Sequence, residues 1–239
     1  GYGSWATAIV KTLTTNNHHV DWLVLNEEIR SSLERRGRNS KYLPWCDIER
    51  SLITPSDDIN ALVRDADVVF LAMPSAFFKK FMEPLTESLA DKIVVSAVKG
   101  IIPGDYLTIV EHVNRYYNVP MQNMCVVTGP SHAEEVGQCR LSYLTVASES
   151  TQTAEVVESL LANDYFRCST SHDVLGVEGA AIMKNVYALA VGIAVGLRYG
   201  DNFQAVLIAG CAAEMNRFLN EAVPIESRDI NAAAYMGDL

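Results

Sequence analysis

Residues 1–6 read GYGSWA and fit the pattern G-x-G-x-x-G/A, the tight turn through which a backbone approaches the pyrophosphate of a dinucleotide. A helix is expected directly after this turn, because Ala6, Ile9 and Leu13 fall on one face. A strand is expected over 20–26. A pyrophosphate would lie over the N-terminus of the helix, where free N–H groups and the helix dipole favour anions. The motif is weak alone, but followed by a helix and a strand it predicts a dinucleotide-binding α/β domain.

Strands and helices continue to alternate up to Asp173, as they do in a parallel α/β domain. Further strands are expected at 68–72, 92–97, 125–128, 144–147 and 166–169, with a helix over 155–161. Polar turns follow the first three of these strands, at 73–75, 98–100 and 129–134. Ligands of open α/β sheets bind outside the carboxyl ends of strands. The sequence therefore predicts a Rossmann-like doubly wound parallel sheet in which these turns face one crevice.

Such a sheet has its central strand directly before the glycine turn, and no residues precede Gly1. We expect from this that a few N-terminal residues of the natural protein are missing. Residues 235–239, YMGDL, do not resemble a natural ending, so a C-terminal portion is expected to be missing as well. A complete sheet without a central gap would contradict the first expectation.

The pattern changes after Asp173, where strands stop and helices are expected over 174–197, over 202–222 and from about 226. This switch predicts a dinucleotide-binding domain over 1–175 and an incomplete all-α domain over 176–239.

The first of these helices contains the stretch EGAAIMKNVYA (178–188), in which Lys184 and Asn185 lie among small and apolar residues. We expect one long buried helix in which desolvation lowers the pKa of the lysine, a property that suits catalysis. A transmembrane helix is disfavoured, because a mid-span lysine costs roughly 2.5 to 3.5 kcal/mol and no second such segment exists. A core helix whose lysine extends to the surface remains open from this helix alone.

The composition is that of a soluble globular protein. The net charge of −10, without a basic block, argues against nucleic-acid binding. The five cysteines are scattered as in reduced cytosolic proteins, and no Cys and His cluster has metal-ligand spacing. Nothing at the start resembles a signal peptide. A cytoplasmic enzyme without a metal site is therefore predicted.

Two of the predicted turns carry candidate substrate contacts. Lys99, at a strand end, is well placed for an anionic substrate, although most single lysines in loops are simply exposed. Gly129 and Ser131 offer a backbone N–H and a hydroxyl at a helix start, suitable for a substrate oxygen or phosphate. The alternative for Ser131 is an ordinary helix cap, with Glu134 completing a capping box.

Taken in order, the motifs resemble those of the bacterial-type NAD(P)-dependent glycerol-3-phosphate dehydrogenases. They are GYGSWATA (1–8), MPS (73–75), VKGI (98–101), GPSHAEE (129–135), EGAAIMKNVYA (178–188) and MGDL (236–239). No single motif is diagnostic, whereas the ordered set covers essentially the whole chain.

This resemblance implies reduction of dihydroxyacetone phosphate to sn-glycerol 3-phosphate by hydride from a nicotinamide, supplying phospholipid synthesis. Lys184 matches the catalytic general acid/base of the family. The positions that match substrate contacts are Lys99, Gly129, Ser131, Asn185 and Asp238, of which Asp238 could orient Lys184. The positions that match cofactor contacts are Gly1, Gly3, Ser4, Trp5, Lys99 and Ala133.

The chain departs from the family in two ways. A Ser-Arg-Asn cluster that helps to hold the substrate phosphate in the family would follow Leu239, so the chain as given could bind nucleotide and yet be inactive. Many bacterial relatives also carry arginine near the position of Leu25. Its absence, with Glu27 and Glu28 close by, favours NAD over NADP, although Arg30 or Arg36 could still reach a 2′-phosphate.

Two other functions remain open. The 3-hydroxyisobutyrate and 6-phosphogluconate types of β-hydroxyacid dehydrogenase share the fold and a buried lysine followed by asparagine, but the segments GPSHA and MGDL favour glycerol phosphate. A redox-sensing nucleotide-binding module without catalysis would not need Lys184. A homodimer is predicted from the apolar helices of 174–222.

Overall fold

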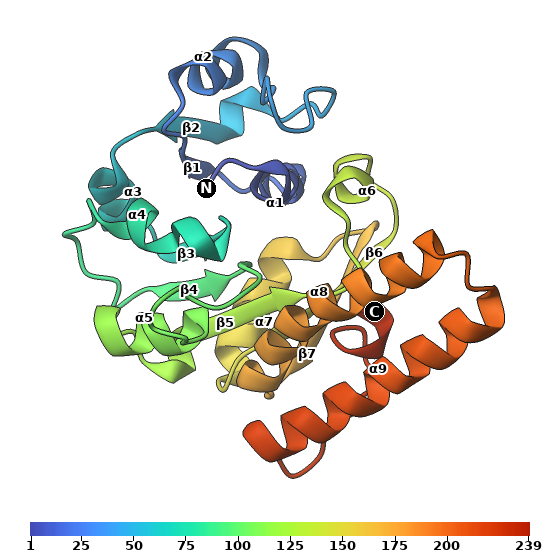
Figure 1. Ribbon diagram of the computed structural model, residues 1–239. Helices are drawn as coiled ribbons and strands as arrows, with labels where there is room; N and C mark the ends of the chain where they lie inside the picture. The colour runs from blue at the N-terminus through green and yellow to red at the C-terminus, as the bar shows by residue number, and fades with distance from the viewer.

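The computed structural model describes all 239 residues as an α/β region followed by two long helices (Figure 1). The strands are β1 (Val20–Leu23), β2 (Ile53–Ser56), β3 (Val68–Leu71), β4 (Ile93–Ser96), β5 (Met124–Thr128), β6 (Ser142–Ala147) and β7 (Phe166–Ser171). The α-helices are α1 (Ser4–Thr15), α2 (Glu27–Arg36), α3 (Ile59–Asp65), α4 (Phe78–Met82), α5 (Ile109–Tyr117), α6 (Ala133–Gly137), α7 (Thr151–Leu161), α8 (Val174–Gly196) and α9 (Asp201–Ala222).

The predicted doubly wound sheet is confirmed, with one departure. Five strands pair in the order β3-β4-β5-β6-β7, and β3, β4 and β5 run parallel. Strand β6 pairs antiparallel with β5, and β7 pairs parallel with β6. Because side chains alternate across each strand, Val94 and Val126 belong to the core shared with α5 and α8, whereas Val95 and Val127 belong to the core shared with α1 and α7. Helices thus cover both faces.

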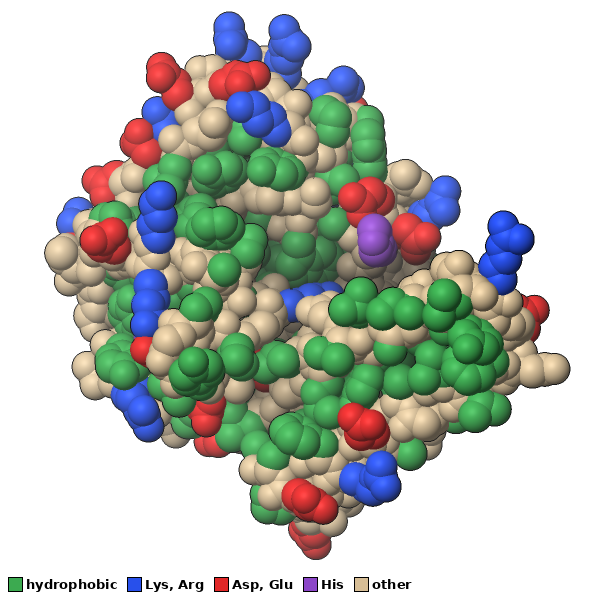
Figure 2. Space-filling model, viewed as in Figure 1, with side chains coloured by type: hydrophobic (Ala, Val, Ile, Leu, Met, Phe, Trp, Pro, Cys, Tyr) green, Lys and Arg blue, Asp and Glu red, His purple; other side chains and the backbone are tan.

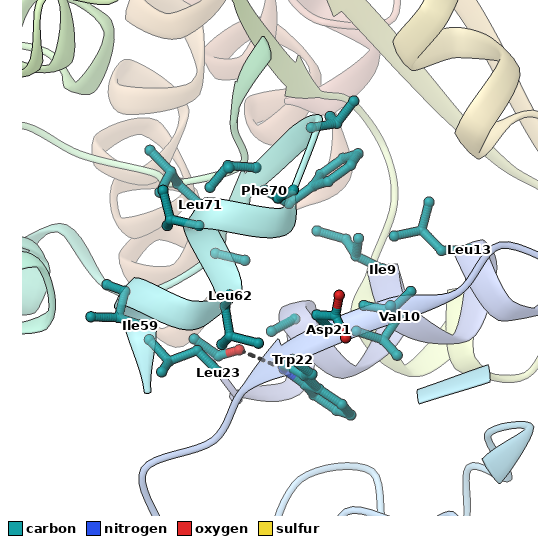
Figure 3. A pocket seen from close by; sticks show the side chains of 18 of the residues that line it. Ile9, Val10, Leu13, Asp21, Trp22, Leu23, Ile59, Leu62, Phe70 and Leu71 are labelled. Carbon is teal, nitrogen blue, oxygen red and sulfur yellow. Dashed lines mark hydrogen bonds between the residues drawn. The ribbon is translucent and has the colours of Figure 1, made fainter. Parts of the chain in front are cut away.

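The sheet is interrupted between β3 and the separate β1–β2 pair. A cavity of about 440 Å³ occupies this position, lined mostly by apolar side chains of α1, β1, α3 and β3 (Figure 3). Ile9 and Leu13 border it from α1, and Ile59 and Leu71 border it from the other side. Doubly wound sheets have their central strand at this position. The interruption explains why the β3 residues Val68–Phe70 are only half-buried.

The helices predicted over 174–197 and 202–222 are confirmed as α8 and α9, which pack side by side (Figure 1). The helix predicted from about 226 is wrong, because the chain there forms turns that end in a short 3₁₀ helix, η4 (Met236–Asp238). The Asp229 side chain accepts a hydrogen bond from the Asn231 N–H at 3.0 Å, which favours a turn over a helix. The domain division at residue 175 stays a prediction, since Val177 and Ala180 share a core with the sheet.

The expectation of one long buried helix is confirmed for the length of α8 but wrong for its burial, because only the N-terminal half is buried. Val177 and Ala180 are fully buried, whereas Val186, Leu189 and Ile193 expose more than half of their surface. Apolar side chains gather over α8 and α9 in Figure 2. By length and composition α8 is the one helix that could cross a membrane, a test that core helices also pass.

Candidate active site

The turns after β3 and β4 meet at the carboxyl edge of the sheet, as the sequence predicts for parallel strands. Gly100 has a φ of +119°, and a Cβ there would lie 2.5 Å from the Ser75 Oγ. Glycine is therefore needed both for the backbone conformation and for the contact between the two turns. Figure 2 shows a hollow on this face of the molecule with a basic side chain at its floor.

The buried pair of Lys184 and Asp238 is the chemical centre of the crevice. Lys184, on α8, donates a hydrogen bond to the Asp238 Oδ2, and only 13% and 8% of the two side chains are exposed. The Thr128 hydroxyl, at the end of β5, lies 3.4 Å from the same carboxylate oxygen. Three elements that are distant in sequence thus place a cation, an anion and a hydroxyl together.

Lys99, in the turn after β4, lies close to this pair. Desolvation at the crevice and the nearby charge of Lys184 together lower the pKa of Lys99 to about 8, although the residue keeps an exposed surface, and the Asp238 carboxylate opposes the shift. The crevice therefore holds two lysines and one carboxylate, an arrangement with a surplus of positive charge that suits an anionic ligand.

The glycine turn before α1 has the free space that a dinucleotide needs. Helix α1 begins at Ser4, no side chain caps it, and no heavy atom lies within 4 Å of the position that a Gly3 Cβ would take. The first-turn N–H groups, including those of Ser4 and Trp5, have no partner within the helix. Gly1 packs so tightly that a Cβ would lie 1.9 Å from the Ala72 carbonyl oxygen. The turn fits a pyrophosphate over the helix N-terminus.

The turn after β5 also requires glycine, at Gly129. Its φ is +154°, and a Cβ would lie 2.6 Å from the Tyr143 carbonyl oxygen. The Ser131 hydroxyl donates to the Gly129 carbonyl oxygen at 2.9 Å. The alternative capping box with Glu134 is wrong, because His132 holds the N-cap position of α6 and no side chain caps that helix. Ser131 is thus turned toward its own loop.

Two further predicted site residues, Ala133 and Asn185, lie apart from the Lys184–Asp238 pair. Ala133 begins α6, which packs against α1, so this residue lies on the side of the glycine turn. Asn185 follows Lys184 on α8, with an exposed side chain that makes no hydrogen bond. The structure therefore brings Lys99, Lys184 and Asp238 together but leaves Asn185 facing outward.

Sequence reasoning missed Thr128 and a second buried cluster formed by Asp173, Arg228 and Tyr235. The position of Thr128 at the end of a predicted strand was an available signal. Asp173, directly before an apolar helix, had the signature of an N-cap. Nothing in the local pattern around Arg228 indicates a buried arginine.

The fold and the crevice place the chain in the class of dinucleotide-binding α/β proteins. Family models described as the N-terminus and the C-terminus of NAD-dependent glycerol-3-phosphate dehydrogenase match residues 1–154 and 173–239. The chain therefore belongs to the NAD-dependent glycerol-3-phosphate dehydrogenase family.

Individual relatives agree with this assignment. A glycerol-3-phosphate dehydrogenase (NAD(P)+) of Halalkalibacterium halodurans is 34% identical over 219 residues, covering 91% of this chain and 63% of that protein. Its counterpart in Geobacillus thermodenitrificans is 36% identical over 242 residues, covering 100% of this chain and 70% of that protein. A crystal structure of glycerol-3-phosphate dehydrogenase from Coxiella burnetii, 27% identical, has a TM-score of 0.88 over 100% of this chain and 72% of its own. The chain spans less than two thirds of the length of several curated relatives.

Proposed function

We propose that this protein interconverts dihydroxyacetone phosphate and sn-glycerol 3-phosphate with NAD(P) as the hydride carrier. The observation that carries the proposal is the buried Lys184–Asp238 pair, which lies at the same edge of the sheet as the glycine turn and Lys99. The family membership and the names of the relatives support the choice of substrate.

The residues of the crevice suit the two requirements of this reaction, which are proton transfer at the C2 oxygen and binding of the substrate phosphate. A nicotinamide, when bound, supplies the hydride chemistry. The ammonium group of Lys184 is suited to donate a proton to the C2 oxygen as the ketone is reduced, and to take it back in the reverse direction. The Asp238 carboxylate holds that ammonium group in position. Lys99 contributes positive charge for the substrate phosphate, with Gly129 and Ser131 as further substrate contacts.

We propose NAD as the preferred cofactor, on the basis of the residues after β1. Leu25, at this strand end, exposes 49% of its surface and has no charge to offer a 2′-phosphate. The Arg30 guanidinium donates to the Val24 carbonyl oxygen at 3.0 Å and lies 2.9 Å from the Asp57 carboxylate. Arg30 is thus already engaged, while Glu27 and Glu28 favour a ribose hydroxyl over a phosphate.

We also propose an oligomeric state and a cellular location for the protein. The exposed apolar residues of α8 and α9 support a homodimer in which a second copy covers them. A cytoplasmic enzyme that feeds glycerophospholipid synthesis agrees with the proposed reaction. The oligomeric state is tested by light scattering on the purified full-length protein, where a monomer at all concentrations would reject the dimer.

The proposed reaction is tested by following reduced nicotinamide absorbance in the full-length protein with dihydroxyacetone phosphate. Oxidised nicotinamide with 3-hydroxyisobutyrate or 6-phosphogluconate provides the comparison. Turnover confined to dihydroxyacetone phosphate is expected. Turnover of a hydroxyacid instead would assign a related dehydrogenase, and nucleotide binding without turnover of any of them would favour a sensing module.

A further inference from the structure

Asp173 caps the helix that carries Lys184. It directly precedes α8, and its Oδ1 accepts a hydrogen bond from the Gly176 N–H at 3.1 Å. The carboxylate lies so close to Gly176 that a Cβ there would be 2.1 Å from the Asp173 Oδ2. A side chain at position 176 would therefore displace the carboxylate from its place at the start of the helix.

The same carboxylate holds a segment from the C-terminal end of the chain. The Arg228 guanidinium donates to both carboxylate oxygens, from Nε at 2.5 Å and from Nη2 at 3.1 Å. The Tyr235 hydroxyl donates to the Oδ2 at 2.5 Å. The Arg228 side chain is only 1% exposed, and it also donates to the Asn220 Oδ1 and the Val223 carbonyl oxygen, both at 2.8 Å. A buried charge pair with this many compensating hydrogen bonds has a single defined geometry.

Tyr235 is joined directly to the turn that carries Asp238. The Asp238 N–H donates to the Tyr235 carbonyl oxygen at 3.1 Å, within the turn that forms η4. The Met236 N–H donates to the Ile230 carbonyl oxygen at 3.0 Å, which closes the loop on the side of Arg228. One carboxylate, that of Asp173, therefore anchors both the helix that carries Lys184 and the loop that carries Asp238.

We propose that Asp173, Arg228 and Tyr235 form a clasp that sets the position of Asp238 against Lys184, and that they are positioning residues for proton transfer. The expected effect of the clasp on turnover rests on the proposed function. The expected effect on the chemical reactivity of the Lys184 amine does not. A carboxylate displaced by about 1 Å can reduce a rate by about 10²-fold, so small losses of anchoring have a measurable effect.

The test uses Tyr235→Phe in the full-length protein, because this variant removes one hydroxyl and keeps the buried ring. Tyr117→Phe is the matched control, since the Tyr117 hydroxyl makes no hydrogen bond and its ring also packs against the core. We expect Tyr235→Phe to lower kcat with dihydroxyacetone phosphate about tenfold, with the KM for NADH unchanged within twofold. The control is expected to change neither quantity. Arg228→Lys, which keeps the charge but loses the two-pronged contact, is expected to act in the same direction.

A second readout is independent of turnover. The hydrogen bond to the Asp238 carboxylate restrains the Lys184 amine, and an amine released from such a contact reacts faster with acetylating reagents. Limited acetylation followed by peptide mass spectrometry is therefore expected to label Lys184 several-fold faster in Tyr235→Phe than in the wild type. In an Asp238→Asn background the same substitution is expected to add nothing, because the clasp acts through Asp238.

The two readouts separate the proposals. Unchanged labelling in Tyr235→Phe would overturn the clasp. An equal increase in the Asp238→Asn background would also overturn it, in favour of a general loosening of the fold. A wild type that does not reduce dihydroxyacetone phosphate would reject the proposed function, and the labelling experiment would still decide the clasp.

Discussion

Lys184 and Asp238 are 54 residues apart in the chain, yet their charged groups form a buried hydrogen-bonded ion pair. The pair joins the middle of α8 to η4, and the Thr128 hydroxyl approaches the carboxylate from β5. Lys99 shares this surrounding, so two lysines face a single carboxylate. Because Asp238 pairs with Lys184, Lys99 has no full counter-charge of its own. Lys184 therefore suits proton transfer, and Lys99 suits the attraction of the substrate phosphate.

The lowered pKa of Lys99 predicts a pH dependence of substrate capture. A lysine with a pKa of about 8 is charged below that pH and neutral above it. Loss of the charge weakens the attraction for a phosphate, so kcat/KM for dihydroxyacetone phosphate is expected to fall about tenfold between pH 7 and 9. Steady-state kinetics in Lys99→Arg check this, because arginine stays charged over the whole range. An equal fall in that variant would assign the dependence to another group.

Substitution of Gly129 is expected to destabilise the fold. Gly129→Ala places a Cβ against the Tyr143 carbonyl oxygen at a φ that side chains rarely adopt. The expected loss is about 2 kcal/mol of unfolding free energy, measured by urea denaturation. Gly192→Ala, on the exposed part of α8 with nothing within 4 Å, is the control and is expected to be neutral or stabilising by up to about 1 kcal/mol. Equal effects of the two substitutions would contradict the strain assigned to Gly129.

Much of the fold could be predicted from the sequence, because the deciding signals are local. The glycine turn, all strands except β2 and the helices α8 and α9 follow from spacing and hydrophobic pattern. Helix α2 was missed although Asn26 caps its start and Gly37, with a φ of +64°, ends it, and both are recognisable signals. The antiparallel pairing of β6 was not visible, because strand direction depends on contacts with the rest of the sheet.

The candidate site could be predicted only in part. The position of Lys99 at a strand end followed from the fold, whereas the partnership of Lys184 and Asp238 was suggested only by resemblance. The buried contact of Arg228 with Asp173 spans 55 residues and leaves no periodic trace in the chain. A long-range pairing of this kind becomes visible only in three dimensions.

Cofactor preference is expected to respond to a single substitution at Leu25. In Leu25→Arg the new guanidinium would lie at the exposed strand end, where it can form charge-assisted hydrogen bonds with a 2′-phosphate. We expect kcat/KM for NADPH to rise about tenfold or more, with the value for NADH changed only a few-fold. Leu25→Met is the neutral control. A wild type that already prefers NADPH would contradict the assignment of NAD.

Glu178, fully buried on α8, predicts a pH dependence of stability. Burial raises its pKa from 4.5 to about 7, against the opposing effect of hydrogen bonds from the Thr108 side chain and the Val110 and Ile109 N–H groups. A carboxyl with a higher pKa in the folded state than in the unfolded chain binds its proton more tightly when folded. Folded stability is therefore lost as the pH rises from about 4.5 through 7, by an amount on the order of 3 kcal/mol.

Urea denaturation at pH 5 and pH 8 checks this sign. From pH 5 to pH 8 the free energy of unfolding is expected to fall by less in Glu178→Gln than in the wild type. Glu155→Gln, on the exposed face of α7, is expected to behave as the wild type does. If the free energy of unfolding changes equally with pH in the wild type and in Glu178→Gln, the pKa of the Glu178 carboxyl is not raised by burial.

The central claim, that Lys184 transfers the proton in a glycerol-3-phosphate dehydrogenase reaction, is tested most directly by Lys184→Ala in the full-length protein. The oxidation of NADH by dihydroxyacetone phosphate and the Kd for NADH are measured in parallel for this variant and the wild type. We predict rapid turnover in the wild type and a loss of about 10²-fold to 10⁴-fold in kcat in the variant, with the Kd for NADH unchanged within twofold. Turnover in Lys184→Ala close to that of the wild type would contradict the account.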